Sequence, residues 1–491
     1  METSAFWSFL LGITALRALF LFTSPLELAP DEAYYWDWSR HLSFGYYSKP
    51  PLVAWIIWLG THTLGPTEAG VRLPALLMGS FSLFFLHETA RRIKGPDTAL
   101  WSVLLSSLTI GASVSAYIMT IDAPLIFFWT MSLFTTWQAL TARRHRPIWW
   151  MTSGLTIGLG LLSKQTMVAF PALLLVFMLF QRDCRPALKS PWPYLSCIIA
   201  ASCLIPTLIW NMDHGWITLL HTKHHFDPNR SGGLEGLKTF LELLGSLFGV
   251  LTPLTFCLIM AAIFWAVKNM KRLDMGERYL FCLGPLPIIL VLLLALNQKV
   301  NPNWPAPFFI TSTVLAAHWG LSHARRLTRA AALVGATMVG LLYLSVYISP
   351  LMPTHGGKFD PYSRLRGWKE LGKHVSGISR ELGYPEKVKY ILAFPRQVVS
   401  ELAFYMDGQP RVYMWKDRSS IKSQYDLWKS PFSTDRAFTA LLVKPDWKGL
   451  KPSQIYLFKT IKPVKHIKLH GLPPKKQGYW IYVGEYDPGT R

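Results

Sequence analysis

Long apolar runs separated by short polar segments dominate the first 350 residues of the chain. A helix rises about 1.5 Å per residue, so roughly 20 apolar residues cross a hydrocarbon core of about 30 Å. About eleven runs approach that length, and they cover residues 5–22, 72–90, 98–118, 123–141, 148–163, 166–181, 192–210, 239–267, 278–297, 305–321 and 328–349. The pattern predicts an α-helical polytopic membrane protein with about eleven transmembrane helices.

The segments between these runs alternate in charge. Every second segment is basic, and cytoplasmic loops of membrane proteins carry an excess of Lys and Arg. The basic segments contain Arg91, Arg92, Lys94, Arg143, Arg144, Arg146, Arg182, Arg185, Lys189, Lys268, Lys271, Arg272, Arg325, Arg326 and Arg329. We therefore expect these loops in the cytoplasm. The alternate segments would then face outward: 23–71, 119–122, the turn at 164, 211–238, 298–304 and everything after 350.

Two outward-facing stretches break the pattern of spanning helices. Residues 31–63 begin with an acidic, Trp- and Tyr-rich sequence and end in a short apolar run, which favours interfacial helices on the outer surface. Residues 350–491 lack long apolar runs and contain strand-like segments such as 389–394. We predict a transmembrane domain over residues 1–349 and a soluble extracytoplasmic α/β domain over residues 350–491.

The composition agrees with a membrane location. Of the 491 residues, 51% are hydrophobic and 21 are Trp, which is more than a soluble core of this size needs. The formal net charge is +22, but the basic residues lie in short loops and in the C-terminal tail. This distribution predicts contact with membrane lipids or an anionic glycolipid rather than with nucleic acid. For the tail, a solvated basic surface that aids solubility is the alternative.

Three carboxylates on the predicted outer side are candidates for chemistry. Asp31 and Glu32 follow the first apolar run, and Asp122 lies between two runs. A partly desolvated carboxylate there can act as a general base, and acids close to hydrocarbon are functional candidates. Each also has a structural alternative: the first two favour the positive end of a helix, and Asp122 can cap the helix that contains Pro124.

Cations on the same side are candidates for binding phosphate. Lys49 precedes two prolines, Lys164 ends an apolar helix and Arg72 lies near the outer end of another. The positive-inside rule disfavours charges there, whereas a phosphate at the interface requires them. Snorkelling of the side chains into lipid headgroups is the alternative.

The outer loop 211–238 is rich in histidine. His221, His224 and His225 could hold a substrate or a metal ion, yet their spacing matches no zinc signature, and a polar loop accumulates His for many reasons. The sequence assigns no cofactor and leaves a divalent metal open. The segment 301–305, with Trp304, is interpreted as a rigid interfacial turn.

The glycines of the run 148–163 do not indicate a nucleotide site. Gly154, Gly158 and Gly160 lack the order of a phosphate-binding loop, and they lie within a predicted membrane helix. Close helix packing explains them better. An enzyme facing outward would have no nucleotide sugar, and a lipid-linked donor would replace it.

Several motifs together resemble a known family. The resemblance runs through Asp31-Glu32-Ala33-Tyr34-Tyr35, Tyr47-Ser48-Lys49-Pro50-Pro51, Val71-Arg72-Leu73, Thr120-Ile121-Asp122-Ala123-Pro124 and Leu162-Ser163-Lys164. Less specific matches follow in 303–305, 400–405 and 423–428. These residues resemble GT-C class glycosyltransferases of the dolichyl-phosphate-mannose protein mannosyltransferase type and their bacterial relatives, among them the lipid A aminoarabinose transferases.

The resemblance implies roles for three residues. Asp31 matches the proposed catalytic base, Asp122 a second acid that supports acceptor or donor, and Lys49 a lysine that contacts polyprenyl phosphate. Ser48 departs from the aminoarabinose transferases, which carry a Glu near a bound metal at this position. The resemblance therefore extends to the reaction class and not to the metal or the sugar.

Together these features predict a GT-C-like glycosyltransferase in a bacterial inner membrane. It would move a sugar from a polyprenyl (undecaprenyl) phosphate to lipid A, lipopolysaccharide or another envelope acceptor at the periplasmic face, with inversion at the sugar. The alternatives are a protein O-glycosyltransferase, a glycolipid transporter or flippase, and a non-catalytic glycolipid-binding subunit. A transporter would be expected to show an inverted repeat with interrupted helices.

Overall fold

The computed structural model describes all residues except 1, 143, 226–232, 416–420 and 491. The chain divides into two compact units. The first comprises Met1–Thr23, Lys49–Ile56 and Arg72–Tyr343, and the second comprises Ser24–Ser48, Ile57–Val71 and Leu344–Arg491. The second unit thus contains, besides the C-terminal region, two segments from the predicted first outer loop.

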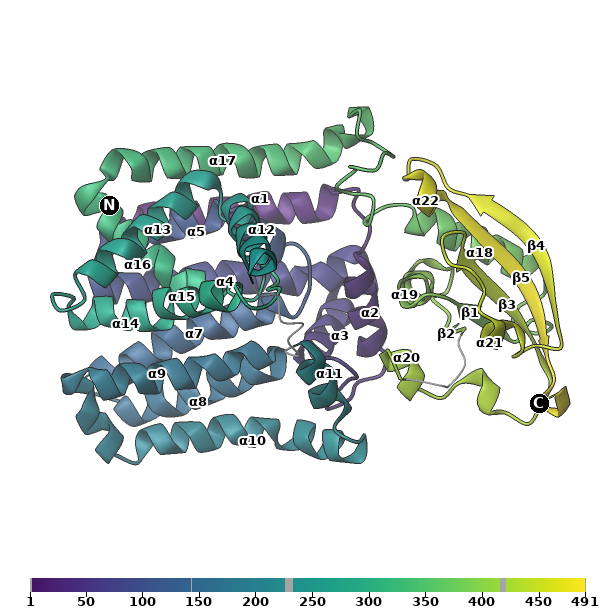
Figure 1. Ribbon diagram of the computed structural model, residues 1–491, viewed down its shortest axis with the longest axis horizontal. Helices are drawn as coiled ribbons and strands as arrows, with labels where there is room; N and C mark the ends of the chain where they lie inside the picture. Colours follow the sequence, from purple (N-terminus) through teal and green to yellow (C-terminus); the bar gives the residue numbers. More distant parts are fainter. Residues whose placement is uncertain (1, 143, 226–232, 416–420, 491) are drawn as a thin grey trace. The chain divides into compact units, whose positions relative to one another are not determined.

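The first unit consists of helices (Figure 1). They are α1 (Glu2–Thr23), α4 (Glu68–Lys94), α5 (Pro96–Ser107), α6 (Ile110–Ser115), α7 (Asp122–Thr141), α8 (Arg146–Ser163), α9 (Ala169–Phe180), α10 (Trp192–Asp213), α11 (Ile217–His225), α12 (Leu234–Val250), α13 (Pro253–Lys268), α14 (Met275–Leu283), α15 (Pro285–Leu294), α16 (Phe308–His323) and α17 (Arg325–Ile348), with 3-10 turns at Gln165–Val168 and Arg182–Lys189. Helices α4 and α17 each continue into the second unit, and α3 (Leu52–Leu64) is divided between the two.

The described residues contain five helices that are long and apolar enough to cross a membrane, or up to seven if two bent pairs each count as one span. The protein is therefore a multi-pass membrane protein, but the predicted count of eleven spans is not confirmed. One reason is that several apolar runs form shorter helices, such as α5 with 12 residues and α16 with 16, and another is that some runs are not straight. The run 239–267 forms α12 and α13, which are bent by 116° at a break where Thr252 adopts φ 63° and Pro253 begins the next helix.

Helix α8 packs between α7 and α10. A Cβ atom on Gly154 would lie 2.5 Å from the Ser196 carbonyl oxygen, and one on Gly158 would lie 2.6 Å from the Cys203 sulfur. These approaches confirm that both glycines serve close helix packing. On the other face of α8, Thr156 forms a 2.9 Å hydrogen bond with Ser132 of α7.

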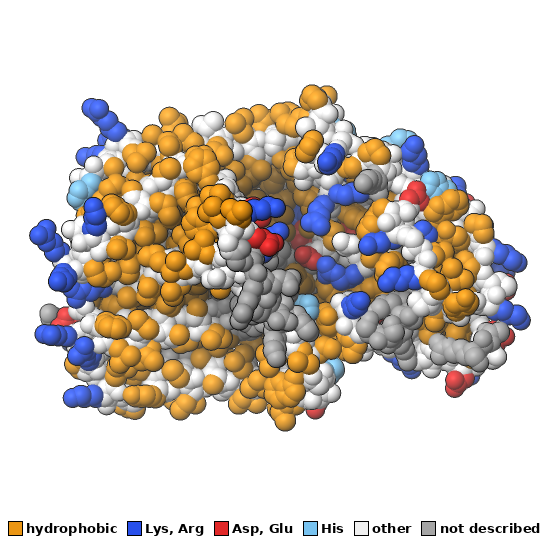
Figure 2. Space-filling model, in the orientation of Figure 1, with side chains coloured by type: hydrophobic (Ala, Val, Ile, Leu, Met, Phe, Trp, Pro, Cys, Tyr) orange, Lys and Arg blue, Asp and Glu red, His pale blue; other side chains and the backbone are white. Residues whose placement is uncertain are grey.

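The basic residues of the predicted cytoplasmic loops lie at helix ends. Arg91, Arg92 and Lys94 are in the last turn of α4, Lys268 ends α13 and Arg325 begins α17. Figure 2 shows Lys and Arg gathered at one end of the helical unit, next to a flank that is mostly hydrophobic. This is the charge distribution that the positive-inside rule leads one to expect.

The second unit contains a five-stranded sheet in the order β2-β1-β3-β5-β4. Its strands are β1 (Tyr390–Ala393), β2 (Val412–Met414), β3 (Phe438–Pro445), β4 (Thr460–Lys468) and β5 (Gly478–Tyr486). β1 pairs in parallel with β2 and β3, whereas β5 is antiparallel to β3 and β4. The helices of this region are α18 (Trp368–Glu381), α19 (Arg396–Tyr405), α20 (Gln424–Leu427), α21 (Pro452–Ile455) and α22 (Pro474–Gln477), with 3-10 turns at Ser349–Leu351, Pro431–Ser433 and Pro488–Thr490. The predicted α/β character and the strand at 389–394 are confirmed.

Helix α2 (Pro30–Ser39) packs against α19 of this same unit. Trp36 meets Phe404 edge to face with ring centroids 4.8 Å apart, and the Ser400 hydroxyl donates to the Pro30 carbonyl over 3.3 Å. All residues from Glu32 to Ser39 are buried. Protein therefore covers much of the surface of α2 that was predicted to lie in the membrane interface.

Candidate active site

Three segments of the first unit bring one acid, one cation and one amide together. Asp122 is the first residue of α7, Lys164 directly follows α8, and Asn303 lies between α15 and α16. Lys164 Nζ donates to Asp122 Oδ1 over 2.7 Å, and Asn303 Nδ2 donates to Asp122 Oδ2 over 2.9 Å. Both carboxylate oxygens of Asp122 are thus oriented by side chains from other segments.

The local backbone explains where Lys164 points. Helix α8 ends at Ser163, and Lys164 is extended, with φ −158° and ψ 141°. Its side chain therefore departs from the helix surface and reaches Asp122. Only 8% of Lys164 is exposed, and a cation so buried requires a counter-charge. The ammonium has three donors, so pairing with Asp122 leaves donors for an anionic ligand.

The sequence identified Asp122 and Lys164 separately and did not predict that they pair. The role of Asn303 was missed, because the segment 301–305 was interpreted as a turn. One signal was present: all three residues lie in segments assigned to the same side of the membrane. Charge alternation placed them on one side, and helix packing brought them into contact.

Asp31 lies in the second unit, near the N-terminus of α2. Its Oδ1 accepts from Arg396 Nη2 over 2.9 Å, and the Asp31 side chain remains 56% exposed. The Arg396 guanidinium also lies over the Tyr34 ring, with Cζ 4.3 Å from the centroid. Arg396 therefore orients the carboxylate of Asp31 while leaving it open to solvent. Sequence reasoning missed Arg396, which is 365 positions away from Asp31 along the chain.

Glu32 has a different environment from Asp31. It is fully buried, and its Oε2 accepts from the Ala29 backbone N–H over 2.9 Å. This contact caps α2 at its N-terminus, where a negative charge is favourable. The burial leaves the Glu32 carboxylate no exposed surface for a substrate, so its geometry favours the structural alternative.

The other two predicted phosphate-binding cations, Arg72 and Lys49, also lie in the first unit. Arg72 is 1% exposed, and it donates to the Tyr117 hydroxyl over 2.7 Å with its Cζ 4.5 Å from that ring. Lys49 is half-buried before Pro50. Arg72 therefore has a structural contact within the helical unit, and Lys49 is the more accessible of the two.

The histidine loop gives no metal centre within the described part of the chain. His221 is half-buried on α11, whereas the side chains of His224 and His225 lie outside the described residues. Among the residues that the structure describes, no three His, Cys, Asp or Glu side chains are grouped so that they could hold a metal ion.

Fold and sequence comparisons show which known proteins the chain is similar to. Residues 48–210 match the family model described as Dolichyl-phosphate-mannose-protein mannosyltransferase. The fold is similar to the crystal structure of ArnT from Cupriavidus metallidurans in the apo state, with a TM-score of 0.65 and 15% identity over 100% of this chain and 99% of that chain. The whole chain therefore has the fold of that GT-C transferase, and its residues 48–210 are similar in sequence to the protein mannosyltransferase family.

Two curated relatives extend the comparison. The lipid A galacturonosyltransferase RgtD of Rhizobium johnstonii is 26% identical over 460 residues, which is 90% of this chain and 94% of the relative. The undecaprenyl phosphate-alpha-4-amino-4-deoxy-L-arabinose arabinosyl transferase of Pseudomonas aeruginosa is 33% identical over 200 residues, which is 37% of this chain and 36% of that relative. The first likeness covers nearly the whole chain, and the second covers about a third of it.

Proposed function

We propose that this protein is a membrane glycosyltransferase that moves a sugar from a polyprenyl phosphate donor to lipid A or another lipopolysaccharide acceptor. The observation that carries the proposal is the likeness to a lipid A galacturonosyltransferase over 90% of this chain and 94% of the relative. The second relative supports the donor class, because its name specifies an undecaprenyl phosphate sugar. The buried cation at Lys164 supports a donor that carries phosphate.

In the proposed reaction, Lys164 and Lys49 bind the donor phosphate, with Arg72 as a third candidate cation. Asp122 orients Lys164, and Asn303 holds Asp122 in place. Positive charge stabilises the polyprenyl phosphate as it leaves, since negative charge develops on its oxygen in the transition state. Lys164, already fixed by its ion pair, loses little conformational freedom when the phosphate binds.

Asp31 is the proposed base for the acceptor hydroxyl. It takes the hydroxyl proton while the oxygen forms a bond to the anomeric carbon and the bond from that carbon to the phosphate oxygen breaks. A single displacement inverts the anomeric configuration, because no covalent enzyme intermediate is formed. Arg396 would position the Asp31 carboxylate for this step.

The proposed location is the periplasmic face of a bacterial inner membrane. The basic helix ends favour the cytoplasm, and residues 119–122, 164 and 298–304 belong to the opposite side. A lipid-linked donor suits this side, since nucleotide sugars are cytoplasmic. Protein hydroxyls are the second candidate acceptor, which the description of the matching family model favours.

The test uses purified protein in lipid nanodiscs with a panel of undecaprenyl phosphate sugars. Lipid A and a Ser/Thr peptide serve as acceptors, and mass spectrometry detects the added sugar. Asp31→Asn should lower transfer by about 10²-fold or more if Asp31 is the base. Asp407→Asn is the matched control, because Asp407 is also an exposed acid, paired with Arg380 over 3.0 Å in the same unit.

Transfer to lipid A by wild type and Asp407→Asn, but not by Asp31→Asn, would support the reaction and its base. Transfer to the peptide but not to lipid A would show that the acceptor is a protein hydroxyl. Normal transfer by Asp31→Asn would refute the base assignment and leave the reaction intact. Absence of transfer with every donor and acceptor would favour a transporter or a glycolipid-binding subunit.

A further inference from the structure

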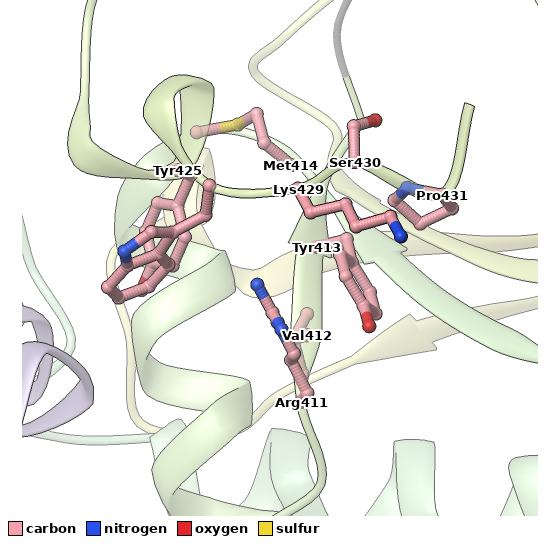
Figure 3. Close-up of a pocket in the computed structure, with 9 residues that line it drawn as sticks. Arg411, Val412, Tyr413, Met414, Tyr425, Lys429, Ser430 and Pro431 are labelled. Carbon is pink, nitrogen blue, oxygen red and sulfur yellow. The ribbon is translucent and has the colours of Figure 1, made fainter. Parts of the chain in front are cut away.

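A cavity of about 420 Å³ opens on the second unit beside β2. Arg411 and Tyr413 from the start of β2 form one side, and the segment 429–436 forms the other. A smaller hollow shares Arg411, Tyr413 and Lys429 with it and extends to Tyr425 and Trp428 (Figure 3). We call the two together the Arg411 pocket. Its volume lies within the range of about 300–1,000 Å³ that small-molecule sites occupy.

The charge of the Arg411 pocket is predominantly positive. Arg411, Lys429 and Arg436 line it, against the single acid Asp435 among the described lining residues. Within the part of the chain that the structure describes, none of the three cations has an ion-pair partner. Three cations around one cavity attract an anionic ligand, and Arg matches the planar geometry of a carboxylate or phosphate.

Two aromatic rings, those of Tyr390 and Tyr413, also line the larger cavity. Tyr413 meets Tyr390 edge to face with centroids 5.5 Å apart, and the Arg411 Cζ lies 4.9 Å from the centre of the Tyr413 ring. Stacking on Tyr413 restricts the guanidinium and pre-organises it for a ligand. A tyrosine combines an apolar ring face with a polar hydroxyl, which suits the apolar face and polar edge of a sugar ring.

One wall of the pocket is bonded to the helix that carries Asp31. The Tyr47 backbone N–H donates to Gln424 Oε1 over 2.7 Å, and the Gln424 N–H donates to the Tyr34 hydroxyl over 2.6 Å. The Tyr34 and Tyr425 rings lie 5.3 Å apart. A ligand in the Arg411 pocket would therefore be held on the same framework as Asp31.

We propose that the Arg411 pocket binds an anionic sugar residue, bearing a carboxylate or a phosphate, of the acceptor. This inference rests on the proposed function only in assigning the sugar to the acceptor. A membrane headgroup is the competing ligand. The concave shape and the aromatic rings favour a sugar, since a cluster of exposed cations is enough to bind anionic lipid headgroups and needs no ring faces.

The test measures sugar binding to the full-length protein in zwitterionic nanodiscs by isothermal titration calorimetry, without any donor. The probes are galacturonic acid and glucosamine 1-phosphate, with galactose and glucosamine as neutral or cationic counterparts. We expect the anionic sugars to bind at least about tenfold more tightly. Whichever of galacturonic acid and glucosamine 1-phosphate binds more tightly shows whether the pocket prefers a carboxylate or a phosphate.

Two substitutions in the pocket and one outside it complete the design. Arg411→Gln and Lys429→Gln should each weaken binding of the anionic sugar by about fivefold or more. Lys465→Gln, which removes an exposed cation from β4, should leave the affinity unchanged. Unchanged thermal unfolding of each variant would show that the second unit remains folded.

Asp31→Asn should bind the sugar like wild type, so loss of transfer and loss of binding are distinguishable. Where transfer is measurable, Arg411→Gln should raise the acceptor KM with little change in kcat. Equal affinity for galacturonic acid and galactose, or no effect of both pocket substitutions, would overturn the proposal. The pocket would instead be a site for lipid headgroups if two results occurred together. Wild type would bind none of the sugars, and a pocket variant would lose the binding to phosphatidylglycerol vesicles that wild type shows.

Discussion

Asp31 and Glu32 are neighbours in the chain, yet their carboxylates have opposite environments. Asp31 is exposed and paired with Arg396, whereas Glu32 is buried and caps its own helix. A helix turns by about 100° per residue, so adjacent side chains point in different directions. In the first unit, Asp122 is held from two sides by Lys164 and Asn303. The role of each carboxylate therefore depends on which side chains or backbone groups the fold places next to it.

The Asp122–Lys164 pair should show energetic coupling. Asp122→Asn and Lys164→Gln each leave a largely buried charged group without its ion-pair partner, so each should lower the stability of the protein in detergent. The double variant should lose less than the sum, with a coupling of about 1–3 kcal/mol. A double-mutant cycle by equilibrium unfolding in mixed micelles measures this quantity.

The exposed pair Lys238 and Glu242, 4.0 Å apart in the same unit, is the matched control. Exposed pairs contribute little, because water and salt screen them. Coupling no larger for Asp122–Lys164 than for this pair would contradict the structural role of the buried contact.

Glu27 should make stability depend on pH. Burial raises the pKa of Glu27 to about 7 from the ordinary 4.5, although the Trp368 backbone N–H donates to it over 2.6 Å. The unfolded chain loses this proton first, so stability is highest below pH about 4.5 and falls by up to about 3 kcal/mol as the pH rises to 7. Thermal unfolding at pH 5 and pH 8 should show this decline.

Glu27→Gln should flatten that pH dependence, since Gln does not titrate. Glu381→Gln, at the exposed end of α18, should keep it. If Glu27→Gln retained the full decline between pH 5 and pH 8, another group would be responsible.

Helices in this protein pack closely where small residues allow it. The glycines of α8 meet α10, and hydroxyl groups join α7 to its neighbours: Thr136 and Tyr279 of α14 form a 2.6 Å hydrogen bond. In an apolar solvent, such contacts replace the hydrophobic driving force between helices. In the second unit, aromatic side chains make the contact instead, since the Trp- and Tyr-rich helix α2 packs on α19.

Gly154→Ala should destabilise the helical unit. The added Cβ would lie 2.5 Å from a backbone oxygen of α10, which cannot rotate away. We expect a loss of about 1–3 kcal/mol, as for overpacking in a core, and a lower unfolding temperature in detergent. Gly12→Ala on α1 meets nothing within 4 Å and should be neutral or stabilising, because Ala favours a helix. Equal unfolding temperatures for the two variants would contradict close packing at Gly154.

The whole molecule combines a net charge of +22 with an apolar helical unit. The basic helix ends predict its orientation, and orientation in turn decides which sugar donors are accessible. Residues 24–48 and the C-terminal region belong to one compact unit, although about 300 residues of the chain separate them. The pocket beside β2 and the Asp31 carboxylate belong to that unit.

The predicted orientation can be tested with fusions to the full chain in bacteria. Alkaline phosphatase fused after Arg491 should be active, because this enzyme matures only outside the cytoplasm. Green fluorescent protein at the same position should be dark, and the reverse should hold for fusions truncated after Lys189. Fluorescence at Arg491 would place the C-terminal unit in the cytoplasm and overturn the periplasmic reaction.

The sequence by itself determined the membrane class, the alternation of basic segments, the packing role of Gly154 and Gly158, the strand at 389–394 and the family resemblance. These features depend on local composition, periodicity and motifs. Only the tertiary structure decided that Lys164 pairs with Asp122, that Arg396 meets Asp31 and that Glu32 is buried. Such outcomes depend on contacts between segments tens to hundreds of residues apart, and no local pattern encodes which distant partner the packed chain brings into reach.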